Sequence, residues 1–349
     1  MKRRLVLCIT LFFCSFAARA TAEPIKVKVV VVAMFEMGQD TGDAPGEFQF
    51  WVEREKLERT WSFPQGERDL RSTSDGSVLG VVTGVGTIHS SATIMALGLD
   101  PRFDLSHAYW VVAGIAGANP NVMSIGSAAW AHWVVDGDLG HEIDAREMPA
   151  GWTTGHIPLR MKAPYEAPMS ASEGQVFRLN PVLVDWAYNL TKDTVLTDTP
   201  GLQKHRALYV GYPKALEAPS VIEGDNLASM NYWHGALMNT WAEGWVKYFT
   251  AGQGTFATSA MEDTGTVQAL TWLTRAGKAD VSRVLVLRTA SNYVMQWPGA
   301  TAAQSLSGES LDKGYSAYIP SLEAAYKVGS RVVHELSNGW AVYELTPPK

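Results

Sequence analysis

The chain alternates between short apolar runs rich in β-branched residues and longer stretches in which apolar residues recur at helical spacing. Residues 27–33 are mostly valine, which is typical of a strand buried on both faces of a parallel or mixed sheet. Similar runs predict strands at residues 78–82, 108–113, 207–210, 255–259 and 284–287. Helices are expected over residues 88–97, 181–190, 232–249, 264–275 and 321–336. Strands that alternate with helices predict an α/β sandwich.

The first 22 residues follow a different pattern. A basic start at Lys2, Arg3 and Arg4 precedes an apolar run over residues 5–16, and alanines follow at positions 18, 20 and 22. This pattern is typical of a secretory signal peptide, and the run is shorter than the roughly 20 residues of a membrane-spanning helix. We therefore expect residues 1–22 to be cleaved and the protein to be secreted across the inner membrane into the periplasm. Residues 23–349 contain no repeat or linker and are expected to form one domain, with polar insertions at 36–71 and 145–172.

Charge and composition narrow the class of partner. The chain has 29 basic and 35 acidic residues, and four of the basic residues lie in the expected leader. An acidic protein is a poor candidate for binding nucleic acid. No later stretch is apolar enough to cross a membrane, and both cysteines lie within residues 1–22. The expected partner is a small molecule.

Two glycine-rich turns end buried strands, at residues 83–86 and 113–117. Gly84 and Gly86 in the first turn, and Ala116 with Gly117 in the second, would let a ligand approach the backbone closely. Tight packing between strand and helix explains such turns equally well.

Two polar clusters also follow strands. Glu262 and Asp263, after Met261, could accept hydrogen bonds from the vicinal hydroxyls of a ribose, or could cap and complement the next helix. Residues 288–292 begin with Arg288 and end with Asn292, whose amide could hold a heterocycle or form a turn.

Taken as a set, these segments resemble the purine nucleoside permease family, which is related to nucleoside phosphorylases and adenosylhomocysteine nucleosidases. The matching stretches are residues 34–36, 83–96, 113–117, 125–127, 144–149, 224–229, 232–235, 260–263 and 288–292. The resemblance implies a phosphorylase/hydrolase-like three-layer α/β sandwich with a central mixed, partly closed sheet. It also implies a pocket for a purine nucleoside at the strand ends of this domain, residues 23–349.

The resemblance implies roles for individual residues. Gly117 and its neighbours would lie against the purine, Met261 and Glu262 against the ribose, and Asn292 against the N7 side of the base. The remaining expected substrate-binding residues are Gly84, Gly86, Ala116, Tyr232, His234, Asp263 and Arg288.

Glu36, Glu262 and Asn292 are the expected catalytic residues. Asn292 cannot donate a full proton, so activation of the base would rest on hydrogen bonding. Glu36 could act as a base toward water, and Glu262 would stabilise the developing cationic sugar. The loop after Glu36 is acidic, and its first basic residue is Arg54. An acidic loop repels phosphate, which favours hydrolysis over phosphorolysis.

Two main hypotheses of function remain open. The protein could cleave purine nucleosides, or it could be a non-catalytic nucleoside-binding component of transport, for which the family is named. A phosphorylase fold with a dead site is a third. We expect no cofactor and no metal, because the eight histidines show no metal-ligand spacing and His132 and His234 lie in aromatic surroundings. The tryptophan-rich stretch 232–249 suits core packing or contacts in a homo-oligomer.

Overall fold

The computed structural model describes residues 23–166, 174–308 and 317–349. The expected signal peptide and the end of the expected insertion, residues 167–172, lie outside the described residues. The strands are β1 (Ile25–Lys26), β2 (Val29–Ala33), β3 (Arg59–Trp61), β4 (Leu70–Ser72), β5 (Val78–Val82), β6 (Phe103–Asp104), β7 (Tyr109–Ala118), β8 (Ala128–Trp130), β9 (Trp133–Asp136), β10 (Gly140–Glu142), β11 (His156–Pro158), β12 (Val176–Arg178), β13 (Val221–Glu223), β14 (Asp225–Ala228), β15 (Phe256–Ala260) and β16 (Val284–Tyr293). The helices are α1 (Gln49–Arg54), α2 (Thr87–Gly98), α3 (Pro181–Thr191), α4 (Pro200–Arg206), α5 (Pro213–Leu216), α6 (Ala236–Phe249), α7 (Asp263–Arg275), α8 (Ala302–Gly308), α9 (Tyr318–Asn338) and α10 (Trp340–Tyr343), with a 3₁₀ turn, η1, at Val281–Arg283.

Strand β7 is the centre of a 12-stranded mixed sheet, whose main path is β12-β9-β14-β15-β7-β2-β5-β4-β3. The first half of β7 pairs with β2, and its last residues, Gly117 and Ala118, pair with β15. Strand β16 runs parallel along the opposite edge of β7 and also pairs with β8, which pairs with β13. Because β7 changes partner from β2 to β15, the sheet curves. The mixed, partly closed sheet expected from the sequence is therefore present.

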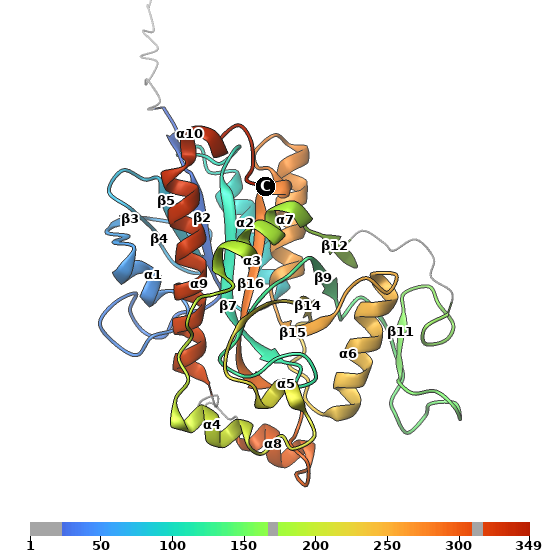
Figure 1. The fold of residues 1–349 in the computed structure, drawn as a ribbon. Coiled ribbons are helices and arrows are strands. Elements are labelled where there is room, and N and C mark those ends of the chain that lie inside the picture. Colours follow the sequence, from blue (N-terminus) through green and yellow to red (C-terminus); the bar gives the residue numbers. More distant parts are fainter. Residues whose placement is uncertain (1–22, 167–173, 309–316) are drawn as a thin grey trace, which may run out of the picture.

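Helices cover both faces of the central strands. Every residue of β2, β5 and β16 is buried, as expected of parallel strands covered on both sides. Helix α9 runs along one face of β7 and β16, and α2 and α7 pack together behind them (Figure 1). Val328, Val332 and Leu336 are among the buried residues of α9 that contribute to the main hydrophobic core. The arrangement is the expected three-layer α/β sandwich.

The pattern of apolar residues predicted most elements correctly and one wrongly. The expected strands match β2, β5, β7, β15 and β16, and the expected helices match α2, α3, α6, α7 and α9. Residues 207–210 do not form a strand; they are a turn after α4. Tyr209 packs on Tyr293, with ring centroids 4.0 Å apart, while Leu208 and Val210 are exposed. Of the four residues 207–210, only Tyr209 is buried, and its aromatic side chain anchors the turn.

Candidate functional site

A cavity of about 470 Å³ opens where the carboxyl ends of the central strands meet. Its walls come from the ends of β2, β7, β15 and β16, from the loop before α1 and from the start of α9. Met34, Phe35, Ile115, Met261 and Tyr318 make much of the lining apolar. A largely apolar cavity with a few polar groups is the usual form of a small-molecule site.

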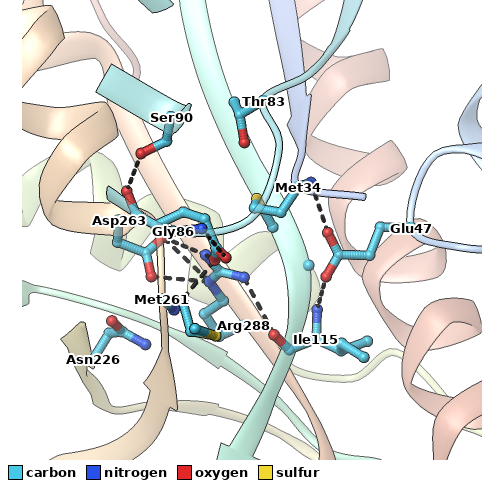
Figure 2. A network of polar contacts seen from close by, with 12 residues as sticks. Met34, Glu47, Thr83, Gly86, Ser90, Ile115, Asn226, Met261, Asp263 and Arg288 are labelled. Atoms are coloured by element: carbon cyan, nitrogen blue, oxygen red, sulfur yellow. Dashed lines mark hydrogen bonds and ion pairs between the residues drawn. The ribbon is translucent and has the colours of Figure 1, made fainter. Parts of the chain in front are cut away.

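A buried arginine organises one wall of the cavity (Figure 2). Arg288 donates from Nε and Nη2 to both carboxylate oxygens of Asp263, at 2.9–3.2 Å. It also donates from Nη2 to Glu262 at 3.0 Å and from Nη1 to the Ile115 carbonyl at 3.2 Å. The two carboxylates keep the pKa of Arg288 above its ordinary value despite its burial. The guanidinium therefore carries its positive charge, and the negative charges of Asp263 and Glu262 balance it.

Glu262 presents its carboxylate to the cavity from the start of α7. Its Oε1 accepts the Gly86 N–H at 3.1 Å, and its Oε2 accepts the Met261 N–H at 3.2 Å. Gly86 precedes α2 and has φ of +92°, a conformation that glycine adopts without strain. Ser90 of α2 donates to the Glu262 carbonyl at 2.9 Å. The position of Glu262 is thus set by the first turns of two packed helices.

Glu47 is a second carboxyl on the cavity wall. It accepts the N–H groups of Met34 and Ile115, each at 2.7 Å, and so joins the ends of β2 and β7 (Figure 2). Burial and the nearby charge of Glu262 together raise the pKa of Glu47 to about 8, although the charge of Arg288 acts in the opposite direction. A carboxyl with such a pKa can exchange a proton near neutral pH. In the sequence, Glu47 is one of several acidic residues in the loop after Glu36, and no pattern sets it apart from the others.

The structure does not bring Glu36 to the cavity, so the expectation that it serves as the base is corrected. Glu36 accepts four backbone N–H groups, from Met37 and Phe48 at 2.8 Å, from Gln49 at 2.5 Å and from Gly46. It is absent from the described cavity lining. Its carboxylate instead holds together the backbone of the loop that contains Glu47.

Asn292 lies on the wall formed by β16, beside Ala116 and Gly117 of β7. The pairing of β16 with β7 shifts register between Ala290 and Asn292, and such an irregularity re-aims the side chains that follow it. The Asn292 amide nitrogen donates to the Tyr232 hydroxyl at 3.0 Å and to the Tyr293 carbonyl at 3.2 Å. Its oxygen accepts the Ser291 hydroxyl at 2.9 Å. Asn292 and Tyr232 therefore form one polar corner.

Four other expected site residues do not line this cavity. Gly86 donates its N–H to Glu262, and Asp263 accepts hydrogen bonds from Arg288, so both contact residues of the cavity wall. Gly84, with φ of +82°, shapes the turn that precedes α2. Neither ring nitrogen of His234 has a hydrogen-bond partner among the described residues, and burial lowers its pKa to about 4. His234 is therefore a neutral packing residue in this arrangement.

Comparison with known proteins identifies the family. The family described as purine nucleoside permease (NUP) matches residues 26–348. This chain belongs to the purine nucleoside permease family. The purine nucleoside permease of Candida albicans is 31% identical over 281 residues, which cover 79% of this chain and 68% of the relative. A probable purine nucleoside permease of Schizosaccharomyces pombe is 28% identical over 273 residues, covering 75% of this chain and 76% of the relative.

Solved structures of nucleosidases share the fold of this chain. A 5′-methylthioadenosine/S-adenosylhomocysteine nucleosidase from S. pneumoniae superposes with a TM-score of 0.51 at 14% identity, over 89% of this chain and 99% of the other. A putative nucleosidase of the same type from Francisella philomiragia gives 0.50 at 14% identity, over 88% and 99%. The nucleosidase-like fold is therefore established. Within the described residues, no helix combines the length and apolar character needed to span a bilayer.

Proposed function

We propose that the cavity binds a purine nucleoside and hydrolyses its N-glycosidic bond. The observation that carries the proposal is the placing of two buried carboxyls, Glu47 and Glu262, on the wall of one apolar cavity that also holds Asn292. Cleavage of a glycosidic bond passes through a cationic sugar, which carboxylates stabilise. Family membership supports a purine nucleoside as the ligand.

Each wall has a part in this proposal. Glu262 and Met261 hold the ribose, and the purine lies toward Ala116, Gly117 and Asn292. Ionised Glu47 takes a proton from a water molecule whose oxygen bonds to the anomeric carbon. The bond between that carbon and the purine nitrogen breaks, and its electron pair leaves with the base. Asn292 stabilises the departing base by hydrogen bonding, and solvent supplies the proton that the base needs.

Water suits this cavity better than phosphate does. Among the described residues of the lining, Arg288 is the one with a positive charge. Its guanidinium is already bound to Asp263, Glu262 and the Ile115 carbonyl. A phosphate group would instead meet Glu47 and Glu262. The electrostatics favour hydrolysis over phosphorolysis.

A second candidate function is nucleoside binding without cleavage, as part of uptake. Asn292 favours it, because an amide cannot protonate the leaving base. The leader-like sequence of residues 1–22 favours a role outside the cytoplasm, and we propose the periplasm as the location in either case.

The purified protein, incubated with inosine or adenosine, separates these functions when free base is measured with and without phosphate. Hydrolysis predicts base release that does not depend on phosphate. Release only with phosphate would contradict the hydrolytic proposal, and measurable binding with no release would support the binding component. Failure of both nucleosides to bind would refute both functions.

A further inference from the structure

A second polar cluster lies outside the cavity and joins three elements that are distant in sequence. His132 is in the turn between β8 and β9, Asp185 is on α3, and Glu223 ends β13. His132 Nε2 lies 3.4 Å from Asp185 Oδ1 and 3.3 Å from Glu223 Oε1. The three candidate ligand atoms all lie within 4.8 Å of one another. None of these residues lines the cavity.

Contrary to the expectation from the sequence that no metal binds, we propose that His132, Asp185 and Glu223 bind a divalent cation, with zinc as the best fit. Zinc binds imidazole nitrogen and carboxylate oxygen at about 2.0–2.2 Å in a tetrahedron, so two ligand atoms lie roughly 3.3–3.6 Å apart. Two edges of the cluster already have this length. The third edge, between two carboxylate oxygens, is no longer than 4.8 Å, and a cation bound between them would draw the two oxygens together. One imidazole with two carboxylates is a hard-to-intermediate ligand set that suits zinc.

The charges around the cluster favour a cation. Asp185 and Glu223 bring two negative charges together, and the ion pairs found for either in the described part of the chain involve only His132. Like charges at this distance repel unless a cation or a proton lies between them. Zinc would relieve the repulsion and bind the neutral imidazole.

The backbone holds the ligands while leaving room for solvent. The His132 N–H donates to Asp225 at 3.0 Å, and its carbonyl accepts the Leu179 N–H at 2.8 Å. Glu223 is fixed by the pairing of β13 with β8. The side chain of Asp185 is 57% exposed and that of Glu223 37%, so water can complete the tetrahedron. A cation bound here would link α3, through Asp185, to the sheet, through Glu223 of β13.

Zinc titration of the metal-stripped full chain tests the site. We expect one equivalent to bind with micromolar or tighter affinity and to raise Tm. His132→Ala and Glu223→Gln should each weaken binding at least tenfold, and Asp185→Asn, at the most exposed position, provides a variant that is expected to fold. The matched control is His334→Ala, because His334 is an exposed histidine paired with one carboxylate, Glu55, at 2.8 Å.

The control should bind zinc as the unchanged protein does. The absence of stoichiometric binding would overturn the proposal, as would binding that is equal in all four variants. Magnesium in place of zinc should give no saturable binding at the same concentrations, since one imidazole replaces an oxygen ligand. Nucleoside binding should persist without zinc, so this test stands apart from the proposed function.

Discussion

The proton on Glu47 decides the pH at which the proposed hydrolysis works. The pKa of Glu47 is raised to about 8, and the ionised form is the one that accepts a proton from water. Base release should therefore fall about tenfold for each pH unit well below 8 and level off above it. Glu47→Gln should reduce the rate about 10²–10⁴-fold, while exposed Glu58→Gln in the same region should have no effect. A rate that is independent of pH between 5 and 8 would contradict the assignment.

Stability gives a check on Glu47 that does not need activity. Its pKa is higher in the fold than the ordinary value of 4.5, so the folded protein binds more protons between pH 4.5 and 8. The contribution of Glu47 to the free energy of unfolding is fully present below pH 4.5 and is lost as pH rises through about 8. This part of the pH dependence should vanish in Glu47→Gln. Denaturant titrations at several pH values would measure it.

Substitutions of Asn292 distinguish the hypothesis of a hydrolase from that of a non-catalytic binding protein. Replacing it by aspartate keeps the size and adds a group that can donate a proton to the leaving base. If the rest of the site is built for cleavage, Asn292→Asp should raise base release at pH 5–6 by about 10²-fold, within the usual range of acid catalysis. Asn292→Ala is the companion variant, and it should lower nucleoside affinity. Equal rates for Asn292→Asp and the unchanged protein would count against an organised catalytic site.

Helices α2 and α7 depend on a glycine where they meet, and both begin at the site. A side chain at Gly265 would collide with the Thr87 carbonyl and the Ser90 hydroxyl. Gly265→Ala should destabilise the protein by about 1–3 kcal/mol, as overpacking does. It should also weaken nucleoside binding, because Ser90 and Gly86 hold Glu262. Gly201→Ala, on the exposed side of α4, is the control and should be neutral in both assays. Unchanged Tm and affinity in Gly265→Ala would refute this coupling.

The sequence predicted elements better than it predicted the role of each carboxylate. Valine-rich runs and glycine-rich turns allowed the strands and the cavity walls to be predicted, because strands buried on both faces leave continuous apolar runs in the sequence. Glu36 and Glu47 lie in one irregular acidic loop, and nothing in its composition tells which of them turns inward. The distinction arises from the fold of the loop, in which Glu36 binds four backbone N–H groups and Glu47 bridges two strands. The family resemblance placed Arg288 among the substrate-binding residues; in the structure its guanidinium lines the cavity and binds the carboxylates of Asp263 and Glu262, which the sequence pattern did not predict.

An intact nucleoside should stabilise the fold more than its base and its sugar do as separate molecules. In the proposed arrangement Glu262, after β15, holds the ribose and Asn292, on β16, holds the base, so an intact nucleoside would contact both for one loss of translational and rotational freedom. In Glu47→Gln, which should bind without cleaving, inosine at 100 times its Kd should stabilise the fold by about 2.7 kcal/mol. Hypoxanthine and ribose together, at the same concentrations, should give a much smaller rise in Tm. If either fragment alone gave the full rise, the ligand would occupy one wall only, and the proposed arrangement of base and sugar would be wrong.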